Sequence, residues 1–381
     1  MSAPWVKWSW LLLVAVVVAH SLSYHWRALP TTAEGYWARG RADYINQDFE
    51  SAIDNLTKSI ARNPRDADAY IYRGEAYAKL HEFAKAIPDI EKALQLRPDY
   101  AKSHAASADV KAALWDAKGA FVGYSRALEL DPEYTRCYLE RGMLSYDAER
   151  WRDAEADFRK SAGLRVGANE ATSQLFIFLA RARAGDVAEA SDELLKVLPV
   201  AEAPGDQFSV AVRFLTGRIA EPDYLAGLAK PDDEDDDVDR VKAEGFFLAG
   251  GRRLAFGDRA VGLAMMRNAL AIESDSSYAR DRARVELETA LVGLHPKWID
   301  GENAGLAIDA VTPGGPAEAA GIRPGWVLET IGGAIASQES FVEFLASAEP
   351  GSTVELQLKT AEGKRVTIPV TLTPGSSAPT R

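Results

Sequence analysis

Residues 67–100 read ADAYIYRGEAYAKLHEFAKAIPDIEKALQLRPDY, and this stretch is one copy of a pattern that recurs along the first half of the chain. The dipeptide Asn63-Pro64 is followed by Arg97-Pro98 and Asp131-Pro132 at successive intervals of 34 residues. Because proline has no amide hydrogen and its ring clashes with the preceding helical turn, each of these prolines predicts the end of a helix. A period of this length, kept over several copies, predicts stacked helical hairpins.

Alignment on these prolines brings small residues into two columns and large apolar residues into a third. A small residue is needed where the paired helices of a hairpin cross at close range, and the large residue fills the gap between one hairpin and the next. The pattern therefore predicts an all-α solenoid. The small columns contain Gly40, Gly74, Ala108 and Gly142, and then Ala52, Ala86, Ala120 and Ala154, and the large column contains Leu56, Ile90, Tyr124 and Phe158.

Residues 33–168 resemble four tetratricopeptide repeats, and the copy at residues 67–100 fits the signature of that family best. After Gly163 the pattern loosens, which predicts degenerate helical repeats over residues 169–230. The resemblance implies that the first helix of each hairpin lines a concave face of the array.

Two further segments follow the degenerate repeats. The run at residues 232–239 has seven acids in eight positions, which predicts a solvated linker over residues 231–240. Helical character returns over residues 241–295, where we expect a repeat-like hairpin and a capping helix.

The predicted concave face suits a peptide or a partner helix, because it mixes aromatic, apolar and charged side chains. It lacks the lysine and asparagine pattern with which chaperone-binding members of the family hold a C-terminal carboxylate. The alternative is that many of the aromatic side chains only pack between repeats. The residues expected on this face are Trp37, Arg41, Tyr44, Ile71, Glu75, Lys79, Lys102, Asp109, Arg136, Met143 and Tyr146.

Beyond His295-Pro296, short apolar segments with glycine and proline turns replace the helical period and predict strands. Residues 311–325 read VTPGGPAEAAGIRPG and resemble the core of the bacterial type of PDZ domain, the kind attached to envelope proteases. The resemblance implies a small, mainly-β domain over residues 300–373, followed by a disordered tail at residues 374–381. Trp326 departs from the family, which usually has an acidic residue after the proline-glycine pair.

The stretch GLAI at residues 305–308 stands where that family has its carboxylate-binding loop. The resemblance implies that backbone N–H groups there bind the C-terminus of a peptide, which extends as an added strand along residues 307–311. Its last side chain is expected in an apolar pocket; the alternative is that the two helical members of that pocket only fill the core. The residues expected at this site are Gly305, Leu306, Ala307, Ile308, Phe341 and Leu345.

An uncharged apolar run at residues 8–19 follows Lys7 and is short of the roughly 20 residues that span a bilayer. Counted from Trp5 to Trp26, however, the segment has spanning length and aromatic residues at both ends. Residues 1–30 are therefore expected to be a signal anchor or a cleaved signal peptide. Either interpretation predicts a protein of the cell envelope with the bulk of the chain exported, on the periplasmic side in a Gram-negative bacterium.

The net charge of −12 and the pI near 5.1 argue against a nucleic-acid partner. The single cysteine, Cys137, falls inside a helical repeat and is expected to be a buried apolar side chain. No metal site, cofactor or small-molecule substrate is expected, and the motifs of serine hydrolases, zinc proteases and phosphate-binding loops are absent from the sequence. We therefore predict a non-catalytic scaffold or adaptor, which delivers clients to an envelope protease or, alternatively, organises a membrane or secretion complex. A PDZ-bearing protease-like enzyme is the remaining alternative.

Overall fold

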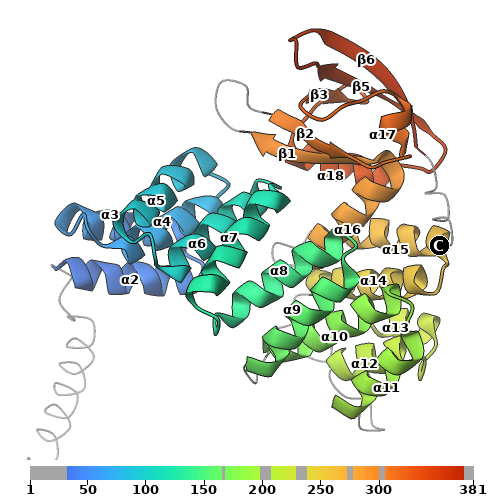
Figure 1. The fold of residues 1–381 in the computed structure, drawn as a ribbon, viewed down its shortest axis with the longest axis horizontal. Coiled ribbons are helices and arrows are strands. Elements are labelled where there is room, and N and C mark those ends of the chain that lie inside the picture. The colour runs from blue at the N-terminus through green and yellow to red at the C-terminus, as the bar shows by residue number, and fades with distance from the viewer. Residues whose placement is uncertain are drawn as a thin grey trace, which may run out of the picture. The chain divides into compact units, whose positions relative to one another are not determined.

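The computed structural model describes residues 32–164, 168–197, 207–228, 238–272, 278–299 and 305–372 (Figure 1). The predicted anchor at residues 1–30, the tail at 374–381 and positions 231–237 of the acidic linker lie outside these ranges. Within the described ranges, no helix has the combination of length and apolar character needed to cross a membrane. The chain divides into two compact units, Met1–Asp99 and Tyr100–Arg381.

Two antiparallel helical hairpins form the described part of the first unit. They are α2 (Ala33–Ile45) with α3 (Phe49–Arg62), and α4 (Ala67–Lys79) with α5 (Phe83–Leu96). The helices end where the prolines predict, since α3 stops just before Asn63-Pro64 and α5 just before Arg97-Pro98. Side-chain caps begin three of them: Thr32, Asp48 and Asp66 accept backbone N–H groups of the first turn.

The small and large columns of the repeat meet inside each hairpin. A Cβ atom added at Gly40 would lie 2.7 Å from Cγ of Leu56, and one added at Gly74 would lie 2.7 Å from Cδ1 of Ile90. Leu56 also belongs to an apolar cluster that includes Ala69 of the next hairpin. The large residue therefore packs on the glycine of its own hairpin as well as between hairpins.

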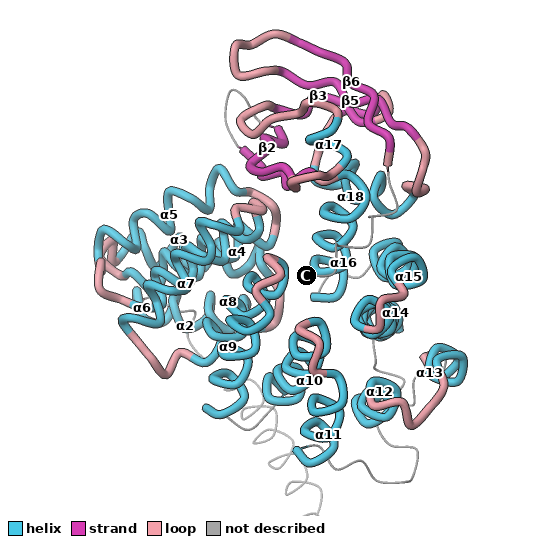
Figure 2. Tube along the Cα trace, turned by 45° about the vertical axis from the view of Figure 1, so that its right-hand side comes forward, coloured by secondary structure: helices cyan, strands magenta, loops and turns pink. Residues whose placement is uncertain are grey.

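The second unit continues with helical hairpins. Helix α16 contacts α14 and α15, and it also reaches α8. In Figure 2, α16 lies among α8, α10, α14 and α15. The helices are α6 (Ala101–Ala113), α7 (Ala117–Leu130), α8 (Thr135–Asp147), α9 (Trp151–Leu164), α10 (Ala168–Arg183), α11 (Val187–Val197), α12 (Gln207–Leu215), α13 (Glu221–Gly227), α14 (Val238–Ala255), α15 (Arg259–Ala271), α16 (Tyr278–Leu287) and the π-helical turn η1 (Glu288–Val292).

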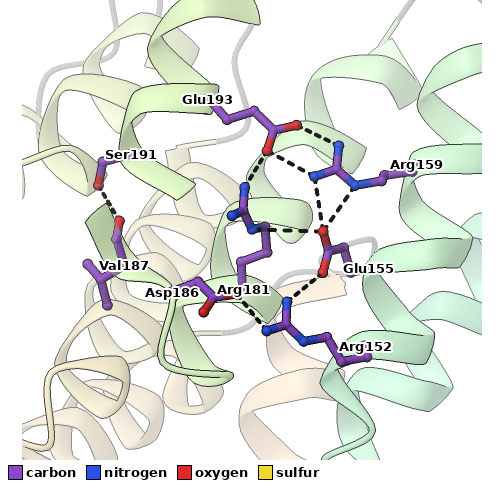
Figure 3. Close-up of polar contacts among 8 residues, drawn as sticks. All are labelled: Arg152, Glu155, Arg159, Arg181, Asp186, Val187, Ser191 and Glu193. Carbon is purple, nitrogen blue, oxygen red and sulfur yellow. Dashed lines mark hydrogen bonds and ion pairs between the residues drawn. The ribbon is translucent and has the colours of Figure 1, made fainter. Parts of the chain in front are cut away.

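An ion-pair network joins α9, α10 and α11 (Figure 3). Glu193 of α11 accepts from Arg159 of α9, with an Nη2–Oε2 distance of 2.9 Å, and from Arg181 of α10. Arg181 also lies 3.8 Å from Glu155 of α9. Because the Glu193 carboxylate binds arginines of both α9 and α10, these ion pairs link the last recognisable repeat to the degenerate repeat that follows.

The C-terminal part of the second unit is an antiparallel sheet with the order β1-β2-β3-β5-β6, and β4 pairs with β3. This sheet confirms the predicted change from helices to a mainly-β region. Ser337 and Ser340 form a capping box at the start of the longer helix of this region. The elements are β1 (Leu294–Ile299), β2 (Gly305–Val311), α17 (Pro316–Ala319), β3 (Val327–Ile331), β4 (Ala334–Ile335), α18 (Gln338–Ser347), β5 (Thr353–Lys359) and β6 (Arg365–Thr371).

Candidate protein-binding surfaces

An aromatic surface lies on the first helices of the two hairpins in the first unit. Tyr72 of α4 meets two rings of α2 edge-on, with centroid distances of 6.4 Å to Trp37 and 5.4 Å to Tyr44. The exposed side chain of Arg41 donates its Nε–H to the Tyr72 hydroxyl at 3.0 Å. The three rings are half-buried, so packing orients them while part of each stays accessible. We call Trp37, Arg41, Tyr44 and Tyr72 the aromatic surface.

The structure brings together three residues that the sequence predicts for this face and adds one that it missed. Tyr72 lies three positions before the predicted Glu75, a spacing that puts both on one side of a helix, and this was the available signal. Lys79 is exposed near the C-terminal end of α4, whereas Ile71 is fully buried. The prediction of Ile71 as a contact residue is therefore wrong, because its side chain fills the hairpin core.

Asp109 and Arg136, both predicted as binding residues of the second unit, bind each other. Arg136 donates to both carboxylate oxygens of Asp109, at 2.9 Å from Nη1 and 2.7 Å from Nη2. Asp109 also accepts the Tyr124 hydroxyl at 2.7 Å. Burial, followed by the charge of Asp109, raises the pKa of Tyr124 well above its ordinary value. These groups stabilise the contact between neighbouring hairpins.

Tyr146 and Met143 are buried, at 1% and 5% exposed, and Lys102 is half-buried. The ring of Tyr146 packs edge-on against Trp151 at 4.9 Å and Phe176 at 5.7 Å. The alternative interpretation, that such aromatic side chains pack between repeats, is therefore what the structure shows for Tyr146.

A cleft of about 250 Å³ lies where α16 approaches α8 and α10. Arg282 of α16 pairs with Asp147 of α8 at 2.9 Å, and Tyr278 packs on Phe176 of α10 at 5.4 Å. Helix α16 thus covers part of the face that the sequence predicts as open to a ligand. The cleft is lined by Leu139, Glu140, Met143, Thr172, Tyr278, Asp281 and Arg282.

Strand β2 pairs with β1 along its length and with β3 at Leu306 and Ala307, so the start of the predicted strand addition along residues 307–311 already has strand partners on both sides. Its residues pair with β1, for example Ala307 with Lys297, and also with β3, for example Ala307 with Val327. The physical reason is that residues 294–299 form the edge strand, which the sequence argument missed. The alternation of Leu294, Pro296 and Trp298 with the polar His295 and Lys297 was the available signal.

The predicted carboxylate pocket is part of the core. Gly305 opens β2 and is buried, and Ala307 is half-buried within the sheet. Leu306, Ile308, Phe341 and Leu345 are at most 1% exposed. The alternative interpretation, in which the two helical side chains fill the core, therefore fits the described residues.

One stretch of the chain matches a known protein family, and larger parts of it resemble solved structures. Residues 67–100 match the family model described as the tetratricopeptide repeat. The chain resembles a tetratricopeptide repeat protein from Parabacteroides merdae, with a TM-score of 0.43 and 15% identity over 67% of this chain and 98% of that one. It also resembles YrrB, described as a TPR protein with an unusual peptide-binding site, with a TM-score of 0.35 and 20% identity over 44% of this chain and 87% of that one.

A third similar structure is the first TPR of Spaghetti (RPAP3) bound to an HSP90 peptide, with a TM-score of 0.29 and 26% identity over 31% of this chain and 94% of that one. No curated protein sequence matches the chain. The family match coincides with the stretch on which the sequence argument rests. Residues 67–100 therefore contain a tetratricopeptide repeat.

Proposed function

We propose that this chain is a non-catalytic scaffold that binds partner proteins through the aromatic surface on α2 and α4. The observation that carries the proposal is the joint placement of Trp37, Tyr44 and Tyr72 with the exposed Arg41. Aromatic and arginine side chains are enriched at the centres of protein interfaces, because they bury a large area and still form directed polar contacts. Packing of the rings against one another lowers the entropy lost on binding.

The charges around the aromatic surface favour a particular kind of partner. Arg41 and Lys79 are exposed on the same two helices that present the rings. A peptide or helix with apolar side chains and neighbouring carboxylates complements this arrangement. The tetratricopeptide match supports the same class of function.

The first thirty residues support the proposal that this scaffold works at the cell envelope. Their apolar run and flanking aromatic residues are typical of a signal anchor or signal peptide. Retention of the chain in the membrane fraction after alkaline extraction supports an anchor, and release supports cleavage. A cytoplasmic pool of intact chain contradicts the envelope location.

Two roles within this proposal make different predictions. An adaptor for an envelope protease binds its clients transiently, and the amount of a client rises when the scaffold is deleted. A structural assembly factor remains in a stable complex, and its partners are lost from that complex when the scaffold is deleted. Quantitative proteomics of a deletion strain, together with crosslinking, separates the two roles.

The binding surface is tested with a matched pair of charge-reversed variants of the full chain. In one variant Arg41→Glu and Lys79→Glu reverse the charges beside the aromatic surface. In the control, Lys58→Glu and Lys85→Glu make the same change on α3 and α5, where both side chains are exposed. We expect the first variant to recover at least about tenfold less partner in a pull-down and the control to match wild type. Equal recovery by both variants contradicts the proposed surface.

A further inference from the structure

The turn between α6 and α7 contacts two elements of the C-terminal domain, which comprises the sheet β1–β6 with helices α17 and α18. The backbone N–H of Trp298 on β1 donates to the carbonyl oxygen of Leu114 at 2.8 Å. The side-chain amide of Gln338, the first residue of α18, donates to the carbonyl oxygen of Ala113 at 3.0 Å. Because β1 is the edge strand of the sheet, the turn pairs with a backbone donor that none of the described strands uses.

Trp115 is the apolar anchor of this contact. Its ring centroid lies 6.1 Å from that of Phe341 on α18, and the guanidinium carbon of Arg284 lies 4.1 Å from the ring centroid. Phe341 is fully buried. The indole therefore lies between the C-terminal domain and α16, where a stacked cation adds to the apolar contact.

The backbone of Trp115 is in the left-handed region, with a φ of 62°. A bulky side chain is unusual there and costs on the order of 1 kcal/mol or more. The residues at the same position of the other three repeats have the same backbone but polar side chains. They are Gln47, His81 and Glu149, with φ values of 62°, 57° and 56°.

Two ion pairs flank the indole. Lys297 of β1 lies 3.0 Å from the carboxylate of Asp116, and Lys118 of α7 lies 2.9 Å from the carboxylate of Asp309 on β2. The turn thus presents a carbonyl group, an aromatic ring and a carboxylate in consecutive residues. The C-terminal domain supplies a strand-edge donor, an aromatic residue and a lysine that match them.

We propose that the α6–α7 turn is a built-in ligand of the C-terminal domain, which keeps the outer edge of β1 and the start of α18 closed. A partner segment with an aromatic residue followed by a carboxylate opens this contact by competing for the same groups. The strained Trp115 is the residue of the turn that makes the aromatic contact with the C-terminal domain, whereas the same position in the other three repeats has a polar side chain. This contact lies within the second unit and shares no residue with the aromatic surface, so the proposal stands or fails independently of the scaffold role.

The test uses a fluorescent peptide with the sequence of residues 111–118, KAALWDAK, and the full chain. Trp115→Gly removes the indole and relaxes the turn, because glycine adopts a positive φ without strain. We expect this variant to bind the peptide on the order of tenfold more tightly than wild type, since the internal competitor is lost. Glu149→Gly makes the same backbone change one repeat later and is expected to leave the affinity at the wild-type value.

A charge exchange at Lys297 identifies the site and provides a second variant if Trp115→Gly does not fold. Lys297→Glu in the otherwise unchanged chain places two carboxylates together and weakens the docked turn without altering Trp115. We expect this variant to prefer the peptide KAALWKAK over KAALWDAK, whereas Trp115→Gly prefers KAALWDAK. The proposal is overturned if wild type and both variants bind each peptide with equal affinity. It is also overturned if the variants bind more tightly but Lys297→Glu does not prefer KAALWKAK over KAALWDAK.

Discussion

Arg73 of α4 and Asp89 of α5 form a two-point ion pair, with Nε–Oδ2 and Nη2–Oδ1 distances of 2.7 Å. Arg141 and Asp157 form the same pair two repeats later, with distances of 2.8 Å and 2.7 Å. Both carboxylates are buried side chains. The repeat therefore carries a periodic polar contact as well as its columns of small and apolar residues.

Substitution of Asp89 tests the contribution of this pair to stability. Asp89→Asn removes the charge but keeps the shape, so the mostly buried Arg73 loses its counter-ion. We expect the free energy of unfolding to fall by about 2–3 kcal/mol, which urea denaturation followed by circular dichroism measures. Asp54→Asn removes an exposed carboxylate paired with Lys58. This variant is expected to change the free energy of unfolding by less than about 0.5 kcal/mol. A similar small effect for both variants contradicts a structural role of the pair.

Steric contacts predict opposite effects of alanine substitution at two helical glycines of the second unit, Gly142 and Gly163. A Cβ atom at Gly142 would lie 2.8 Å from Cε1 of Phe158, a rigid and fully buried ring. Gly142→Ala is therefore expected to destabilise the chain by about 1–3 kcal/mol. At Gly163 of α9 the added Cβ would meet no atom from other described parts of the chain within 4 Å, so Gly163→Ala is expected to stabilise the chain by up to about 1 kcal/mol. Thermal denaturation of both variants checks the opposite signs.

The joint between α8 and α16 predicts a pH dependence. Burial raises the pKa of Asp147 to about 7, against the opposing effect of Arg282 and Arg284. The unfolded chain releases this proton near pH 3.8. Between these two values the folded state binds more protons than the unfolded state, so stability falls as the pH rises and levels off above about 7.

Asp147→Asn is expected to flatten this slope, measured as the free energy of unfolding between about pH 5 and pH 7.5. Burial also raises the pKa of Glu288 to about 7, so the single variant removes only part of the dependence. Glu288→Gln added to Asp147→Asn is expected to flatten the slope further. An unchanged slope in both variants contradicts the assignment to these carboxylates.

The period of the sequence predicts local structure because the determinants are local. Pro64 and Pro98 determine where helices end, and Gly40 and Gly74 allow the two helices of a hairpin to approach closely. Neither effect depends on which hairpins pack next to them. The same reasoning cannot place contacts between segments distant in sequence, because many apolar faces satisfy the same pattern. The packing of α16 on α8 is one such contact.

Two incorrect predictions, one in the sheet and one in the helical repeats, have the same origin. The resemblance of residues 305–308 to a carboxylate-binding loop predicts a ligand site at Gly305, but β1 occupies the edge of the sheet, and only strand pairing determines this. The position of Asp109 and Arg136 on the first helices of their hairpins predicts that they bind a ligand, but these successive helices bring the two charges together and they neutralise each other. Charge reveals that a partner is needed and does not reveal which partner satisfies it.

Cys137 reports the opening of α8, because it is the single cysteine of the chain and is fully buried. Burial raises the pKa of its thiol to about 12, despite the opposing charge of Arg136. At pH 8 the native thiol is therefore expected to react with a disulfide reagent only when the helix opens, at a rate that urea accelerates. Glu149→Cys in a Cys137→Ala background places a thiol on the exposed end of the same hairpin and is expected to react without delay. Fast reaction of the native thiol, equal to that of the exposed one, contradicts a closed α8 and with it the packing of this helix against its neighbours.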